Sequence, residues 1–203
     1  MRSAGFALGF VALALTGAAA ACNGNTSPPR DDSPPSVSTS TTIRPTVAWP
    51  AASTVDDRAL QSLIAGATAA RGTAAREIRA LVSRSPVPVL APRTLELTAP
   101  TLVVEGEYFA LSGRIDGVTI SLQGTRAAHR YEGIEPAPGN RELRGTRGFV
   151  SFNEGNRTAS WIENGAAYTA DVECADLRDA RCDSEAFLLQ LVAQLAFVGG
   201  SGR

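Results

Sequence analysis

Two dipeptides, Asp116-Gly117 and Asn164-Gly165, constrain the fold of this chain more than any other feature of its sequence. Each dipeptide stands between two runs in which apolar and polar residues alternate. Asp-Gly and Asn-Gly are preferred in the type I′ turn of a two-residue β-hairpin, because both central residues of that turn need a positive φ. The sequence therefore predicts two β-hairpins, which pair their strands antiparallel.

The first hairpin is predicted to pair residues 108–115 with residues 118–123, with Ile115 opposite Val118. Side chains alternate between the two faces of a strand, so this register also assigns each residue to a face. The apolar residues collect on one face, and mostly polar residues collect on the other. The first set is Phe109, Leu111, Ile115, Val118, Ile120 and Leu122, and the second is Tyr108, Ser112, Arg114, Thr119, Ser121 and Gln123.

The second hairpin is predicted to pair residues 159–163 with residues 166–174. In this register Trp161 lies opposite Tyr168, and Ala159 lies opposite Ala170. A further strand is expected at residues 149–152, because a turn-rich stretch at 153–157 separates it from the hairpin.

Helices are predicted before and after these strands. Residues 54–84 have apolar residues at helical spacing, with Thr54 and Asp57 as a capping box and a break near residues 72–73. Prolines at 86 and 88 end the helical pattern, and residues 85–92 are expected to be extended, as an edge strand.

A C-terminal helix is expected to begin at Asp183 or Ser184 and to end at Gly199-Gly200. Its apolar stripe consists of Phe187, Leu188, Leu191, Val192 and Leu195. Together the elements predict an α+β fold for a single domain at residues 53–203. That fold is an antiparallel sheet of five or more strands, with an N-terminal helical segment and a C-terminal helix packed on one face.

The N-terminus has the organisation of a secretory signal peptide, predicted over residues 1–21. Arg2 precedes an uncharged, mostly apolar run at residues 5–16, and small residues lead up to Cys22. This arrangement resembles the bacterial lipobox, in which the cysteine is acylated and becomes the mature N-terminus. The alternative is ordinary cleavage after Ala19-Ala20-Ala21, which would leave Cys22 as a free thiol.

Residues 22–52 are predicted to be the lipidated N-terminus and a disordered tether, because Ser, Thr and Pro dominate the stretch from Asn23 to Pro50. Trp49 either docks on the domain or lies idle in the linker. The expected location is the cell envelope outside the cytoplasm: the outer membrane of a host with two membranes, otherwise the outer face of the plasma membrane.

The two remaining cysteines, Cys174 and Cys182, are predicted to form a disulfide, since an exported domain favours oxidation of an even pair. The alternative is a metal pair. It lacks the nearby histidines or further cysteines of a zinc site, so no metal is expected.

Few residues qualify for catalysis. All 19 basic residues are arginine and there is one histidine, which excludes a Schiff-base lysine and any site with two imidazoles. His129 is the one imidazole base, and Glu105 with Glu107 is a carboxylate pair expected on one strand face. Both are interpreted as surface groups, and neither an enzyme nor a cofactor is expected.

An arginine-rich segment is a candidate site for an anionic ligand, because guanidinium groups bind carboxylates and phosphates with two hydrogen bonds. Its members are Arg126, Arg130, Arg141, Arg144 and Arg147. The alternative is ordinary ion pairing on the surface, since glutamates are interleaved. The net charge of −1 gives no reason to expect a nucleic-acid partner.

The last third of the chain carries a resemblance. The stretch Trp161-Ile-Glu163-Asn-Gly165-Ala-Ala-Tyr168, followed by Cys174, Cys182 and an apolar segment, resembles a family of uncharacterised bacterial lipoproteins with a Trp-x-Glu-x-Gly-x-x-Tyr strand pair. It is more distantly similar to lipoprotein-carrier and anti-sigma-factor-like envelope domains. The resemblance implies an envelope location and no particular activity.

These observations favour a lipid-anchored envelope protein that acts as a non-catalytic binding or interaction module. It is expected to contact the membrane through Cys22, and envelope proteins or an apolar ligand are its expected partners. The alternative is a carrier or sensor of a hydrophobic ligand, such as a lipid or lipoprotein, held between sheet and helices. A hydrolase is the third and least favoured hypothesis.

Overall fold

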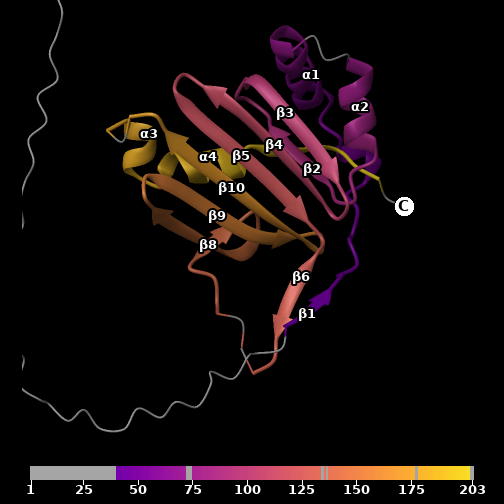
Figure 1. Ribbon diagram of the computed structural model, residues 1–203, viewed down its shortest axis with the longest axis vertical. Coiled ribbons are helices and arrows are strands. Elements are labelled where there is room, and N and C mark those ends of the chain that lie inside the picture. The colour runs from indigo at the N-terminus through magenta and orange to yellow at the C-terminus, as the bar shows by residue number, and fades with distance from the viewer. Residues whose placement is uncertain (1–39, 72–74, 134, 136, 177, 202–203) are drawn as a thin grey trace, which may run out of the picture. The chain divides into compact units, whose positions relative to one another are not determined.

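The computed structural model describes residues 40–71, 75–133, 135, 137–176 and 178–201. Its main element is a seven-stranded antiparallel sheet with the strand order β3-β4-β5-β10-β9-β8-β7 (Figure 1). The α+β class predicted from the sequence is therefore observed. The strands of this sheet are β3 (Thr98–Glu105), β4 (Tyr108–Ile115), β5 (Val118–Thr125), β7 (Arg141–Leu143), β8 (Thr146–Asn153), β9 (Asn156–Glu163) and β10 (Ala166–Cys174).

Both predicted hairpins have the predicted registers. Ile115 lies opposite Val118 in the β4–β5 pair, and Trp161 lies opposite Tyr168 in the β9–β10 pair. The turn residues Asn164 and Gly165 have φ values of 53° and 74°, as a type I′ turn requires. The same φ signs recur at Arg144-Gly145 and Glu154-Gly155, so two further hairpins join β7 to β8 and β8 to β9.

One face of the sheet, called the inner face below, is buried against the helices and against a two-stranded pair of β2 (Val89–Pro92) and β11 (Leu195–Gly199). Tyr168 is central to this face: its ring stacks on Trp161 with 5.5 Å between centroids. Its hydroxyl donates to the carbonyl oxygen of Pro88 over 3.0 Å, and burial raises the pKa of this phenol. The most buried large side chains of the sheet are Phe109, Leu111, Val118, Ile120 and Val172.

The N-terminal helical segment consists of α1 (Asp57–Arg71) and α2 (Ala75–Ser83), which lie beside β3 (Figure 1). The predicted capping box is wrong by two residues. The side chain of Asp56, not that of Thr54, accepts the hydrogen bond of the Ala59 amide over 2.9 Å, while the Thr54 hydroxyl donates to the carbonyl oxygen of Ala51. Asp is a better N-cap than Thr, so the local preference agrees with the observed cap, and the spacing of Thr54 and Asp57 was misleading.

The predicted C-terminal helix is too long. Helix α4 covers only Ala186–Ala193, and residues 195–199 form β11, which pairs antiparallel with β2. In β11 the side chains of Leu195, Ala196 and Val198 are buried. Leu195 fits the helical apolar stripe equally well, so the spacing of apolar residues alone cannot reveal where this chain changes from helix to strand.

Cys174 and Cys182 form a disulfide, as predicted, between the end of β10 and the short helix α3 (Ala180–Asp183). Asp179 caps α3 by accepting from the amide of Arg181. Hydrogen bonds from the side chain and amide of Arg181 hold the pKa of the Asp179 carboxyl at about 2. The same guanidinium donates to the carbonyl oxygen of Asp116 over 2.8 Å, which ties this junction to the β4–β5 turn.

The last residues of the predicted tether belong to the folded part. Residues 40–43 form β1 (Ser40–Ile43), which pairs with β6 (Ala128–Tyr131) in an arm that projects from one end of the sheet (Figure 1). The amide of Ala48 donates to the carbonyl oxygen of Asn164 over 2.8 Å. The ring of Trp49 lies so close to Gly200 that a Cβ there would be 2.4 Å from it, so Trp49 docks on the domain. The described part of the chain therefore has regular structure before residue 53, in β1.

Candidate functional site

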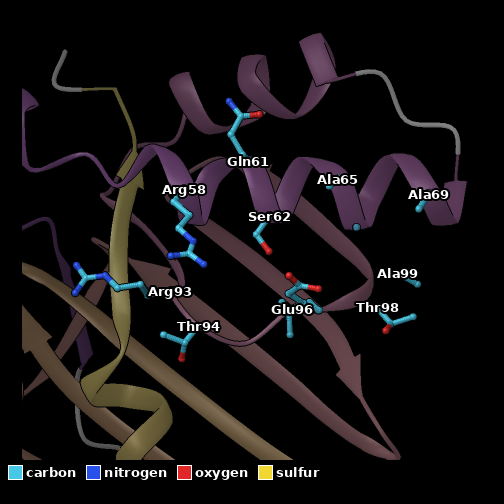
Figure 2. A pocket seen from close by; sticks show the side chains of 12 residues that line it. Arg58, Gln61, Ser62, Ala65, Ala69, Arg93, Thr94, Glu96, Thr98 and Ala99 are labelled. Carbon is cyan, nitrogen blue, oxygen red and sulfur yellow. The ribbon is translucent and has the colours of Figure 1, made fainter.

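A groove of about 700 Å³ lies between α1 and the segment that leads from β2 into β3 (Figure 2). Its volume falls in the range of small-molecule sites, roughly 300–1,000 Å³. We call it the α1 groove. It is lined by Arg58, Gln61, Ser62, Ala65, Gly66 and Ala69 from α1, and by Arg93, Thr94, Glu96, Leu97, Thr98 and Ala99 opposite.

Helix α1 divides its residues between the core and this groove. Leu60, Leu63 and Ile64 are buried, while Arg58 and Ala65 lie on the exposed side. Helical periodicity therefore brings Arg58, Ser62, Ala65 and Ala69 along one wall. The opposite wall is formed by the segment that connects β2 to β3 and by the first residues of β3.

Two opposite charges face each other across the α1 groove without pairing. Figure 2 shows the Arg58 guanidinium on one wall and the Glu96 carboxylate on the other, with the Ser62 hydroxyl directed into the space between them. Neither Arg58 nor Glu96 has an ion-pair or hydrogen-bond partner for its side chain within the part of the chain that the structure describes. Both charged groups are thus available to a ligand.

Arg93, the second arginine of the groove, already forms an ion pair. Its Nε donates to Oδ2 of Asp56 over 2.8 Å, which joins Arg93 to the N-terminus of α1. The amide of Ala59, followed by Arg93, holds the pKa of the Asp56 carboxyl below its usual value. Asp56 therefore balances the charge of Arg93, and the charges of Arg58 and Glu96 remain.

Close backbone packing shapes the inner end of the groove. Gly66 lets α1 approach the strand, because a Cβ there would lie 2.5 Å from the carbonyl oxygen of Leu97. A β-bulge interrupts the pairing of β3 with β4 between Thr98 and Thr101. Within it, Ala99 has a φ of 52°, a conformation that alanine rarely adopts.

This strain gives a testable prediction. Replacing Ala99 by glycine should raise the free energy of unfolding by about 0.5 kcal/mol. The left-handed conformation costs an L-residue about 1–2 kcal/mol, and the extra entropy of unfolded glycine offsets roughly half of that gain. Urea denaturation checks the sign, with Ala110→Gly in β4 as the control. Ala110 has no positive φ, so glycine there should be destabilising.

The face of the sheet opposite the inner face, the outer face, is open. Short polar side chains cross it in register, including Ser112, Ser121, Asp171 and Thr158 on neighbouring strands. Larger apolar side chains stand exposed around them: Val103, Tyr108, Phe149 and Ile162. A shallow hollow of about 290 Å³ lies among Tyr108, Gln123, Thr125, Ala167 and Thr169.

The five arginines of the predicted anionic site do not form one cluster. Arg126 pairs with Glu107, Arg141 with Glu185, and Arg144 with Glu163. Arg147 donates to the carbonyl oxygen of Gly139 over 2.6 Å. Arg130 lies in β6, in the projecting arm. Arg126, Arg141 and Arg144 therefore take part in ion pairs, which is the alternative stated in the sequence-based prediction.

The predicted carboxylate pair is separated by a turn. Glu105 ends β3, whereas Glu107 lies beyond it and binds Arg126 and, over 3.0 Å, Arg44. These arginines, first the hydrogen bond from Arg126, hold the pKa of the Glu107 carboxyl below its usual value. The assignment of both glutamates to one strand face is therefore wrong, because the Gly106 turn reverses the chain between them.

His129 is exposed on the β1–β6 arm. Its Nδ1 lies 3.4 Å from the Thr42 hydroxyl, which is the side-chain hydrogen bond the structure gives it. Among the described residues no carboxylate forms a hydrogen bond or an ion pair with His129. Across the same residues there is no group of three or more His, Cys, Asp or Glu side chains placed to bind a metal ion.

The predicted signal peptide at residues 1–21 and the lipidation site Cys22 lie outside the described residues. None of the described helices is both long enough and apolar enough to cross a membrane.

No family model, curated protein or solved structure matches this chain. The α1 groove is the candidate ligand site on the basis of its size and of the side chains that line it. The groove could not be predicted from the sequence, because its two walls come from segments more than 20 residues apart, whose approach depends on tertiary packing. The local signal for it is Gly66, which is half-buried in a helix otherwise rich in alanine, where glycine is costly unless close packing needs it.

Proposed function

We propose that this protein is a non-catalytic binding module of the cell envelope, anchored through an acylated Cys22, which takes its ligand in the α1 groove. One observation carries the proposal: a groove of ligand size holds the unpaired side chains of Arg58 and Glu96 on opposite walls. Sites for small molecules combine a concave surface with a few polar groups that converge on the ligand.

The N-terminal sequence supports the location. The small residues before Cys22 fit cleavage and acylation at that residue, and two or three acyl chains make membrane attachment stable. Residues 23–39 then supply a spacer rich in Ser, Thr and Pro before β1 begins at Ser40. The disulfide supports an oxidising compartment. In a host with two membranes we place the anchor in the outer membrane.

The packing of the inner face favours this proposal over a carrier of hydrophobic ligands. Such a carrier would hold its ligand between the sheet and the helices. At that place Phe109, Tyr168 and Leu188 are 0–3% exposed and Tyr168 is hydrogen-bonded to Pro88. Side chains thus already occupy the space a lipid would need.

The test is native mass spectrometry of the full-length protein extracted from its own envelope. We expect acyl mass on Cys22, the loss of residues 1–21, and a non-covalently bound small molecule. The variant Ala65→Phe should keep the acyl mass and lose the bound molecule, because Ala65 is an exposed residue of α1 whose larger side chain would fill the groove.

The matched control is Ala80→Phe, at an exposed position of α2 that does not line the groove. It should retain the bound molecule. An unacylated Cys22 would refute the anchor. Retention of the ligand by Ala65→Phe, or absence of any bound molecule from the wild-type protein, would refute the α1 groove as the site.

A further inference from the structure

We infer that the ligand of the α1 groove is a zwitterion, specifically a short peptide with both termini free. This inference rests on the proposed function and names the chemical class of its ligand. The Arg58 guanidinium would bind the C-terminal carboxylate, and the Glu96 carboxylate would bind the N-terminal ammonium group. The Ser62 hydroxyl, which lies between them in Figure 2, would hydrogen-bond to the peptide amide.

The charge balance of the groove selects a zwitterion over a simple ion. Arg93 is neutralised by Asp56, so one positive and one negative group remain. A ligand with only an anionic group would gain from Arg58 but would lie near the Glu96 carboxylate. A ligand with only a cationic group would gain from Glu96 but would lie near the Arg58 guanidinium. Opposing charges of this kind discriminate between partners by repulsion as well as by attraction.

The separation of the two charges supports a ligand between them. Arg58 and Glu96 line the same groove, yet their charged atoms do not come within the 4.0 Å of an ion pair. Both side chains are exposed, and a zwitterion that bridges them would pair both charges at once.

The walls of the groove carry several small residues. Ala65, Gly66 and Ala69 line it from α1, and Ala99 lines it from β3. L-alanyl-L-alanine is the appropriate probe, because it is a short peptide that carries both charged termini and its methyl groups avoid clashes with these walls.

The experiment measures binding of three probes to the full-length protein by isothermal titration calorimetry. They are L-alanyl-L-alanine, its N-acetyl derivative, which lacks the ammonium group, and its C-terminal amide, which lacks the carboxylate. We expect the zwitterion to bind about tenfold more tightly than either capped peptide, because each cap removes a hydrogen bond between charged groups; tenfold in Kd is about 1.4 kcal/mol.

Two variants assign each end of the peptide to its wall. Arg58→Gln should bind L-alanyl-L-alanine and its amide equally, while it still discriminates against the acetylated peptide. Glu96→Gln should bind L-alanyl-L-alanine and the acetylated peptide equally, while it still discriminates against the amide. The matched controls are Arg79→Gln and Glu77→Gln on α2, which remove the same charges at exposed positions outside the groove and should keep the wild-type preferences.

The inference is overturned if the wild-type protein shows no preference for the zwitterion, or if Arg58→Gln and Glu96→Gln leave the preferences unchanged. These results are distinct from failure of the proposed function. A native bound molecule that Ala65→Phe abolishes, but that carries only one kind of charge, would leave the binding module intact and remove the zwitterion alone. Failure of the anchor would show at Cys22 and would not affect the titrations.

Discussion

Replacing Glu163 by alanine is expected to lower the free energy of unfolding by about 3 kcal/mol. Arg144 and Glu163 form a bidentate ion pair, with distances of 2.5 Å and 3.0 Å between guanidinium nitrogens and carboxylate oxygens. Their side chains are only 17% and 22% exposed, so water replaces these bonds poorly. Removing one partner of such a pair leaves the other charge uncompensated, which costs about 3–5 kcal/mol when the pair is fully buried.

The pair is also part of a larger network. The indole N–H of Trp161 donates to Glu163 over 3.1 Å, and Arg144 donates to the carbonyl oxygen of Leu195 over 2.7 Å. Arg144 thereby fixes the β7–β8 turn against the start of β11. Glu163→Ala would leave the Trp161 N–H without its acceptor as well, which adds to the cost.

The measurement is urea denaturation of the two single variants Arg144→Ala and Glu163→Ala and of the double variant. We expect the double variant to cost less than the sum of the singles by about 2 kcal/mol, because the lost interaction is shared. Glu163→Gln is the control: it keeps the volume and an acceptor for Trp161, so its cost should be smaller. A loss below about 1 kcal/mol for Glu163→Ala would show that the pair behaves as an exposed surface pair.

The same network shows why arginines that are close in the sequence do not form one cluster in the fold. Arg141, Arg144 and Arg147 are close in sequence, but a two-residue turn at Arg144-Gly145 separates the first from the last on two paired strands. Arg144 has a φ of 50° in that turn, and its side chain is directed to α4 and β11. Arg-Gly is not among the dipeptides typical of a type I′ turn, so no local pattern predicted this turn.

Sequence patterns predicted the centre of the sheet well, because two independent signals agree there. Turn chemistry at Asp116-Gly117 and at Asn164-Gly165 fixes the register, and the alternation of apolar residues assigns the same buried face. Where only one signal exists, the predictions fail. Residues 195–199 satisfy the helical spacing, but their pairing with β2, about 100 residues away in sequence, makes them a strand.

The arm and the α1 groove could not be predicted for the same reason. Strand β1 has a sequence of Ser and Thr that is typical of a linker, and it is a strand because β6 pairs with it. The groove likewise exists only where α1 is placed against the start of β3. In each case local sequence patterns describe one segment, and they contain no information on the distant segment that packs or pairs with it.

Removing the disulfide, by the double replacement Cys174→Ala and Cys182→Ala, is expected to lower the free energy of unfolding by about 2–3 kcal/mol. The disulfide joins residues with a sequence separation of 8, and closing so short a loop in the unfolded chain has roughly that entropic effect. Alanine is chosen because both sulfur atoms belong to residues that are 4–5% exposed, where serine would bury an unpaired hydroxyl. Urea denaturation checks the value, and wild-type protein kept in reductant should show a similar loss.

A second interaction, made by Arg157, also holds α3 against the sheet, and it allows a further test of the disulfide's contribution. The Arg157 guanidinium donates to the carbonyl oxygens of Cys182 and Asp183, each over 2.7 Å, and so fixes α3 to β9 independently of the sulfur atoms. Arg157→Met should therefore cost more in the disulfide-free protein than in the wild type, because without the covalent link these hydrogen bonds alone keep α3 in place. Strictly additive costs would contradict this coupling. A disulfide contribution below about 0.5 kcal/mol would mean that Arg157, together with Arg181 at the β4–β5 turn, already secures α3 against the sheet.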